Sequence, residues 1–157
     1  MDAIVLGDQR YAVERARLPD LPALVALLAD DPLGSLRETT DLTVYERAFD
    51  AIDRDPHQFL AAVRDPRAAL VGTMQLTVIP GLSRGGTTRL QIEAVRVADS
   101  ARGAGLGSAM FAWAHDFGRH HGAGLAQLTT DKTRPDAHRF YARLGYAATH
   151  EGLKLAL

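Results

Sequence analysis

The chain has 157 residues, of which 46% are hydrophobic and 24% charged, and its net charge is −1 at pH 7. These values are ordinary for one globular domain, here residues 1–157, and they disfavour nucleic-acid binding. The absence of cysteine excludes disulfides, thiolate nucleophiles, an acyl-cysteine intermediate and cysteine-ligated zinc. No apolar run reaches membrane-spanning length and the first residues lack a signal-peptide pattern, so we expect a cytoplasmic protein that binds no membrane.

The first third of the chain reads as one strand followed by two helices. Residues 11–17 alternate polar and apolar side chains, which predicts a strand. A helix is predicted over residues 20–29, with Asp20 as its cap and an apolar stripe on one side. After a loop at residues 30–41, a second helix is predicted over residues 43–52.

The middle of the chain is predicted to be a sheet. Strands at residues 59–63 and 69–79 are separated by Asp65-Pro66, which is a hairpin signal. A glycine-rich connection at residues 80–86 leads into a strand at residues 88–97, which we expect to be the central one.

The last third contains two predicted helices. Residues 106–121 carry an apolar stripe of the kind that packs against a core. The final helix starts at Pro135 and ends at Gly145, because proline is tolerated in the first turn and glycine favours the position after the last turn. Three short strands are also predicted here, at residues 125–129, 146–148 and 153–157.

Residues 102–108, Arg-Gly-Ala-Gly-Leu-Gly-Ser, lie between the predicted central strand and the following helix. Glycines allow a tight turn and a close approach of a ligand, and the first amides of a helix attract anions. A P-loop would need a lysine that this turn lacks, and a dinucleotide site would need a glycine where Ser108 stands. The third pattern, Arg-x-x-Gly-x-Gly, is matched in full by Arg102, Gly105 and Gly107.

This glycine turn resembles the acetyl-CoA loop of the GNAT superfamily of N-acetyltransferases. A second motif supports the resemblance, because residues 137–146, Ala-His-Arg-Phe-Tyr-Ala-Arg-Leu-Gly-Tyr, are similar to the Ala-x-x-Phe-Tyr-x-x-x-Gly-Phe segment of that superfamily. The resemblance covers residues 58–157. It departs from the family at Arg134, where many members have an asparagine that contacts the pantetheine arm.

The resemblance implies an α/β (α+β) GNAT fold, with a mixed central β-sheet splayed around acetyl-CoA and flanked by about four helices. The coenzyme is expected to wedge between the strands of Glu93 and Leu125. The Arg102 side chain either assists the pyrophosphate or is solvated. Pantetheine would pair with free backbone groups of the central strand, and the expected coenzyme-binding residues are Val95, Arg96, Val97, Arg102, Gly103, Ala104, Gly105, Leu106, Gly107, Ser108, Arg134, Ala137 and Phe140.

Acetyl transfer to an amine needs a base for the amine proton and a proton donor for the departing thiolate. Glu93 lies where the superfamily often keeps a basic carboxylate, and the alternative is that it is a surface residue of an alternating strand. Tyr141 matches the family's general acid, and the alternative is a core tyrosine packed beside Phe140. A phenol with a pKa near 10 is protonated at neutral pH and can therefore donate.

Other catalytic classes find less support in the sequence. The histidines at 115, 120 and 121 lack the i, i+4 spacing of a helical metal site, so we expect no metal. No serine has the context of a hydrolase nucleophile. The sequence therefore indicates an acetyl-CoA-dependent N-acetyltransferase acting by direct attack on a primary amine of a small molecule. A protein N-terminal or lysine acetyltransferase, and a non-catalytic acyl-CoA-binding regulatory module, are the alternatives, and a homodimer is possible at the family level.

Overall fold

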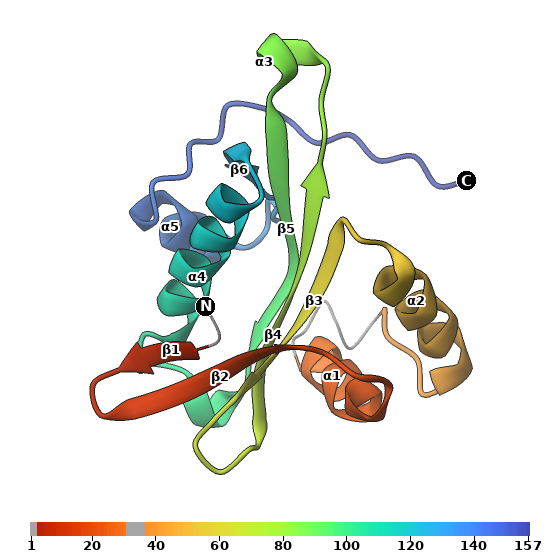
Figure 1. The fold of residues 1–157 in the computed structure, drawn as a ribbon, viewed down its shortest axis with the longest axis vertical. Coiled ribbons are helices and arrows are strands. Elements are labelled where there is room, and N and C mark those ends of the chain that lie inside the picture. Colours follow the sequence, from red (N-terminus) through yellow and green to blue (C-terminus); the bar gives the residue numbers. More distant parts are fainter. Residues whose placement is uncertain (1–2, 31–36) are drawn as a thin grey trace.

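The computed structural model describes residues 3–30 and 37–157, and these residues form one six-stranded sheet with helices on both faces (Figure 1). The strands lie in sequence order, antiparallel from the first to the fifth, and the sixth pairs parallel with the fifth. They are β1 (Ala3–Leu6), β2 (Gln9–Arg15), β3 (Gln58–Arg64), β4 (Leu70–Ile79), β5 (Thr88–Val97) and β6 (Ala123–Gln127).

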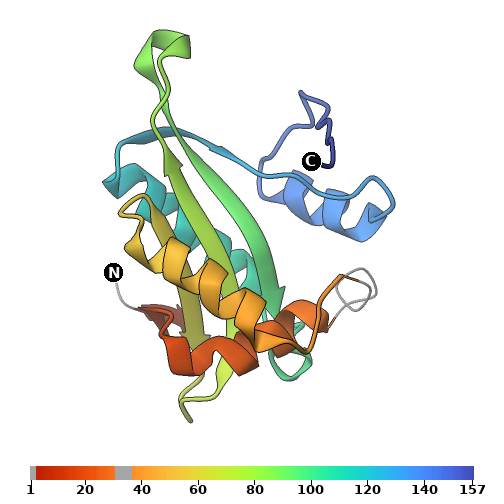
Figure 2. The same cartoon turned by 90° about the vertical axis from the view of Figure 1, so that its right-hand side faces the viewer.

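Five helices accompany this sheet within the described residues. Figures 1 and 2 show two of them, α1 and α2, on one face of the sheet and α4 on the other, with α5 on the α4 side. The helices are α1 (Leu21–Ala29), α2 (Leu42–Arg54), the single turn α3 (Ser83–Gly86), α4 (Leu106–His120) and α5 (Pro135–Arg143). None of the described helices is long and apolar enough to cross a membrane.

Each face of the sheet has its own hydrophobic cluster. Beneath α4 the larger cluster contains Met110 and Phe111, which are almost fully buried, and residues from β1 to β5. Beneath α1 and α2 a smaller cluster contains Leu24 and Phe49. Because both faces are covered, the middle strands are apolar on both sides, and Ala61, Ala62 and Val63 in β3 are all fully buried.

The sequence predicted most of these elements. The mixed α+β fold is confirmed, the strand at 88–97 coincides with β5, and the helices predicted at 20–29, 43–52 and 106–121 correspond to α1, α2 and α4. The β3–β4 hairpin turns at Asp65, whose carboxylate accepts hydrogen bonds from two backbone N–H groups of the turn. The predicted strand at 125–129 begins two residues earlier, as β6.

One local prediction, the Asp20 cap, is wrong, and the structure adds two features that were not predicted, the β1–β2 hairpin and α3. The hairpin of β1 and β2 was not predicted, although its two-residue turn, Gly7-Asp8, is a recognised hairpin signal. Asp20 does not cap α1 through its side chain, because its carboxylate accepts instead from the backbone N–H of Arg17 and from the guanidinium of Arg64. Within the connection predicted at 80–86, α3 forms a tight turn. Of the loop predicted at 30–41, residues 31–36 lie outside the described residues.

The strands predicted at 146–148 and 153–157 are wrong for this structure. Residues 146–157 form no strand or helix, and Leu153, Leu155 and Leu157 are among the most exposed large apolar side chains of the described chain. The alternating pattern was correctly read as a strand pattern, but a strand also needs a neighbour to pair with. No described strand lies alongside this segment.

Candidate active site

The sheet opens next to the glycine turn. β5 pairs with β6 only from Thr88 to Gln91, whereas it pairs with β4 as far as Val97. The backbone of β5 from Ile92 to Val97 therefore has no strand neighbour on the β6 side among the described residues. Free backbone groups on such an edge can pair with a peptide-like ligand.

A β-bulge lies within this open part of β5. Thr73 of β4 is opposite Arg96, and Gln75 is opposite Glu93, so two steps along β4 correspond to three along β5. The extra residue turns the backbone, and Ala94 has a φ of 52°, in the left-handed region. Bulges redirect the neighbouring side chains and end regular pairing, which is what the opening of the sheet requires.

The glycine turn has the conformation that the sequence predicted. Gly103 and Gly105 have φ angles of 80° and 84°, which favour glycine strongly, and a Cβ at either position would meet no atom within 4 Å. Gly105 precedes the first residue of α4, so the amides of the first turn of α4 have no partner within the helix. The open space and the positive end of the helix dipole together suit a phosphate group.

Two residues of the turn region, Leu106 and Gly107, contribute to packing. The Leu106 side chain is 1% exposed in the core, so only its backbone is available to a ligand. A Cβ on Gly107 would lie 3.7 Å from the ring of Phe140 and 3.9 Å from Val97, which shows how closely α4 approaches α5 and β5. The ring of Phe140 packs edge-on against Phe111 at 5.7 Å between ring centroids, while Ser108 and Ala104 are exposed.

The Arg102 side chain is half exposed to solvent and also forms a hydrogen bond and two ion pairs within the chain. Its Nε donates to the carbonyl oxygen of Val97 at 2.9 Å, and its other nitrogens form ion pairs with Asp99 and Asp30. The guanidinium therefore ties the end of β5 to the end of α1. Its backbone remains part of the turn.

Tyr141 is partly buried in α5 beside the opening of the sheet. The hydroxyls of the other three tyrosines are all engaged: Tyr11 donates to Gln9, Tyr45 donates to Glu38, and Tyr146 shares a 2.7 Å hydrogen bond with His115. Among the residues that the structure describes, the hydroxyl of Tyr141 has no such partner.

The charges around Tyr141 come from two elements. Burial raises the pKa of its phenol above the ordinary value of 10.0, and the guanidinium groups of Arg134 and Arg96 oppose this rise without cancelling it. The phenol is therefore fully protonated at neutral pH. The charges of Arg134, directly before α5, and of Arg96 in β5 thus both act on Tyr141.

Glu93 lies at the start of the open segment, directly before the bulge. Its side chain is exposed, and no hydrogen bond or ion pair engages it within residues 3–30 and 37–157. The flanking residues differ, since Ile92 is buried in the core and Ala94 faces the other side of the sheet. A carboxylate in this position is accessible to a substrate from solvent.

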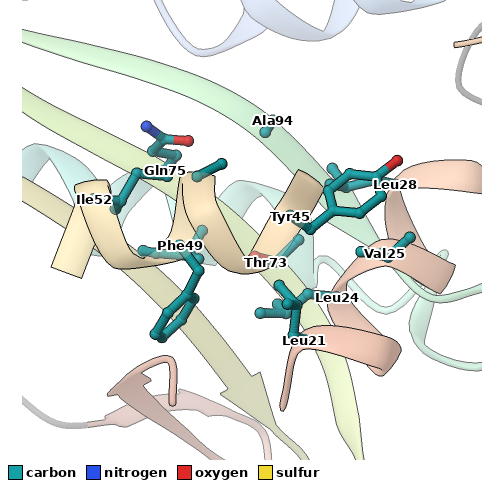
Figure 3. A pocket seen from close by; sticks show the side chains of 12 residues that line it. Leu21, Leu24, Val25, Leu28, Tyr45, Phe49, Ile52, Thr73, Gln75 and Ala94 are labelled. Carbon is teal, nitrogen blue, oxygen red and sulfur yellow. The ribbon is translucent and has the colours of Figure 1, made fainter. Parts of the chain in front are cut away.

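A cavity of about 160 Å³ lies between α1, α2 and the sheet (Figure 3). Its walls are leucines and Val25 of α1, Phe49 and Ile52 of α2, and residues from three strands. Ala94 lines it as well, so the bulge of β5 forms both one wall of this cavity and part of the opening of the sheet.

Sequence reasoning missed the bulge, the cavity and the pairing of His115 with Tyr146. The burial of His115 lowers its pKa, and nearby Arg119 lowers it further while Asp116 opposes. No short motif marks these features, because each depends on residues that are distant in the sequence. The two motifs pointed to this region and to Tyr141, but they did not indicate that Tyr146 bonds to His115.

Comparison with known proteins identifies this arrangement. The acetyltransferase (GNAT) family model matches residues 21–146. A glucosamine 6-phosphate N-acetyltransferase of Trypanosoma brucei brucei is 33% identical over 128 residues, which is 80% of this chain and 84% of that protein. An aminoalkylphosphonate N-acetyltransferase of Salmonella typhimurium is 43% identical over 60 residues, and the match spans only 39% of its length and 38% of this chain.

Solved structures with the same fold cover nearly the whole chain. A protein of Bacillus halodurans C-125 described as a transcriptional regulator superposes with a TM-score of 0.88 and 41% identity, covering 94% of this chain and 99% of that one. An acetyltransferase of Trypanosoma brucei has a TM-score of 0.74 and 26% identity, covering 94% and 99% of the two chains.

Proposed function

The chain belongs to the acetyltransferase (GNAT) family, and from this we propose that it transfers an acetyl group from acetyl-CoA to the primary amine of a small molecule. The proposal includes direct attack in a ternary complex and a cytoplasmic location, where acetyl-CoA is available. The two N-acetyltransferases named above support a small-molecule amine as the acceptor, although each acts on a different compound.

The observation that carries the proposal is the open edge of β5 beside the glycine turn. Residues Ile92 to Val97 offer backbone groups with no strand partner on the β6 side in the described chain. We assign Val95, Arg96 and Val97 to the pantetheine arm and the amides from Gly103 to Ser108 to the pyrophosphate. Arg134, Ala137 and Phe140 would border the coenzyme from α5.

Acetyl-CoA supplies an acetyl group activated as a thioester, and the chain's own residues handle the protons. An alkylamine with a pKa of about 10 is mostly protonated at pH 7 and must lose a proton before it can attack. We assign this step to the Glu93 carboxylate, acting directly or through water. The raised pKa of Tyr141 keeps its phenol protonated, so that it can donate to the thiolate that leaves.

The test combines binding with turnover. Calorimetry should detect acetyl-CoA binding, and release of free thiol from acetyl-CoA should require an added amine. Mass spectrometry of the product should show one acetyl group on the amine nitrogen. If acetyl-CoA fails to bind, the proposed coenzyme site is wrong.

Two other outcomes separate the alternatives. Acetyl-CoA binding without turnover on any amine would identify a non-catalytic acyl-CoA-binding regulatory module. The description of the Bacillus halodurans protein as a transcriptional regulator supports this alternative. Turnover on peptides with a free N-terminus or lysine, but not on small amines, would identify a protein acetyltransferase.

A further inference from the structure

The cavity between α1 and α2 points to the chemistry of the acceptor. We propose that the acceptor amine carries a compact, uncharged hydrocarbon group, about the size of a phenyl or branched butyl group, which fills this cavity. The inference rests on the acetyl transfer proposed above and adds the class of amine.

The walls of the cavity offer no charge to an ionic substrate. Nine of the twelve lining side chains are aliphatic or phenylalanine, and the other three are Tyr45, Thr73 and Gln75 (Figure 3). None of these twelve described residues is cationic. A phosphate or phosphonate placed there would lose its hydration without gaining a counter-ion, which is strongly unfavourable.

Each of the three polar side chains of the wall makes at least one hydrogen bond within the protein. Thr73 Oγ1 donates to the carbonyl oxygen of Ala61 at 2.8 Å, and Gln75 Nε2 donates to the side-chain oxygen of Gln58 at 3.1 Å. The Tyr45 hydroxyl donates to Glu38 at 2.6 Å and accepts from the backbone N–H of Thr39 at 2.9 Å. With these groups engaged, the surface presented to a ligand is apolar.

Size and position both favour a substrate group over an empty packing defect. Benzene occupies an apolar cavity of roughly 150 Å³ in another protein, so the 160 Å³ here is sufficient for one six-membered ring. Ala94 lines the cavity and directly follows Glu93 in the chain. When a hydrocarbon group fills the cavity, an amine joined to it by a short carbon chain therefore lies beside the Glu93 carboxylate.

The reaction then balances with the groups at hand. The amine nitrogen forms a bond to the acetyl carbon while the carbon–sulfur bond breaks. The ammonium first loses a proton through Glu93 to solvent. As the neutral amine attacks, the nitrogen loses its second proton to Glu93 and the sulfur takes a proton from Tyr141, and both side chains then exchange protons with solvent to return to their starting states. The hydrocarbon group takes no part in the chemistry and serves to bind and orient the nitrogen.

A comparison of acceptors tests the inference directly. The value of kcat/KM should be at least about tenfold higher for 2-phenylethylamine and 3-methylbutylamine than for ethanolamine and 2-aminoethylphosphonate, because one buried methylene alone contributes several-fold in binding. A preference for the phosphonate or for ethanolamine would overturn the inference while leaving the acetyl transfer intact.

A pair of matched variants locates the effect. Ala48 and Ala51 are both exposed on α2, but only Ala48 lines the cavity. Ala48→Phe should raise the ratio of the KM for 2-phenylethylamine to the KM for ethanolamine by roughly tenfold. Ala51→Phe should leave this ratio unchanged. Equal ratios in the two variants would mean that the hydrocarbon binds elsewhere.

A binding measurement separates this inference from the proposed function. Calorimetry with 2-phenylethylamine in the presence of CoA reports on the cavity without turnover. If the amine binds the parent chain, and binds Ala48→Phe roughly tenfold more weakly, but is never acetylated, then the cavity assignment stands and the proposed function fails. Absence of binding to the parent chain overturns the assignment.

Discussion

The tyrosines of this chain differ in whether their hydroxyls have a hydrogen-bond partner within the protein. Tyr146 is held by His115 at 2.7 Å, and burial raises its pKa to about 12. Tyr141 lies 6.1 Å away between ring centroids, but its hydroxyl has no intramolecular partner in the described chain. Two buried phenols thus lie side by side, and only one is available to a substrate.

Tyr141→Phe should reduce turnover without reducing stability. The ring keeps its contacts with Phe111 and Phe140, and no intramolecular hydrogen bond among the described residues is lost. Removal of a proton donor typically lowers kcat on the order of a hundredfold or more. The loss should be smaller with an acyl donor whose leaving thiol has a lower pKa, as measured by steady-state kinetics.

Tyr146→Phe is the matched control for that experiment. It removes a hydroxyl that bonds to His115, so it should cost about 1 kcal/mol of stability and lower Tm by roughly 2–4 °C. Its kcat should stay near that of the parent chain. If Tyr146→Phe loses more turnover than Tyr141→Phe, the two roles have been assigned the wrong way round.

Glu93→Gln tests the carboxylate at the bulge. The exposed side chain makes no described hydrogen bond, so the substitution should leave Tm and acetyl-CoA affinity unchanged. Loss of a general base should lower kcat by roughly a hundredfold or more at neutral pH. Activity close to that of the parent between about pH 6 and 9 would show that water alone removes the amine proton.

At the scale of elements, the start of α4 and the bulge of β5 create the site together. The helix begins directly after the left-handed Gly105, so its first amides face the turn. The strand bends at Ala94 just where β6 ceases to accompany it. Neither element would form the proposed site alone, because the turn suits only the anionic end of the proposed coenzyme.

Gly105→Glu should abolish acetyl-CoA binding while the chain still folds. The side chain would enter the open space of the turn, and its negative charge would repel the pyrophosphate. We expect affinity to fall by roughly a hundredfold or more in calorimetry. Gly122→Glu is the control, since Gly122 also has a left-handed φ and open space around it but lies at the far end of α4.

An ion pair joins the turn before α1 to β3 and makes stability depend on pH. Burial raises the pKa of Asp20, but hydrogen bonds from the Arg17 backbone and the Arg64 guanidinium, with the charge of Arg64, lower it below the ordinary 3.8. A carboxyl with a lowered pKa contributes stability above its unfolded-state pKa and loses it as the pH falls through the folded-state pKa.

Asp20→Asn should therefore destabilise the protein at neutral pH and much less in acid. Arg64 would keep its Glu14 partner at 3.4 Å but lose its closer Asp20 partner at 2.6 Å. We expect a loss of about 1–3 kcal/mol at pH 7, measured by urea unfolding. The difference between variant and parent should shrink as the pH falls below about 4. A difference that is constant with pH would mean that packing, and not charge, is responsible.

At the scale of the whole molecule, the sheet is held between two separate cores. The α4 helix approaches β5 so closely that a Cβ on Gly118 would lie 2.9 Å from Leu90, which is 1% exposed. This contact fixes the distance between the helix that carries the glycine turn and the strand that carries Glu93.

Gly118→Val should destabilise the fold by forcing α4 away from β5. Overpacking of this kind costs roughly 1–3 kcal/mol, which should appear as a lower Tm. Ala112→Val is the control, since Ala112 is exposed on the same helix and its extra methyl groups would lie in solvent. If both variants melt at the same temperature, the contact at Gly118 is less tight than the distance indicates.

Most helices and strands could be predicted from the sequence because they depend on residues that are close together in the chain. Apolar stripes identify α1, α2 and α4, proline and glycine mark the ends of α5, and alternation marks β5. The glycine turn was also evident, because a left-handed backbone in an exposed turn calls for glycine. Motifs in residues 102–108 and 137–146 were sufficient to indicate the family.

The tertiary structure decided how these elements meet. The engagement of Arg102 by Asp30 and Asp99, and the cavity beside Ala94, depend on residues brought together from distant parts of the chain. The end of the chain likewise has the alternating sequence of a strand, but it forms no strand because no described strand pairs with it. Sequence by itself therefore determined which local structures are possible and which chemistry is present. Packing decided which groups become neighbours, because burial and pairing are properties of the assembled chain and not of any one segment.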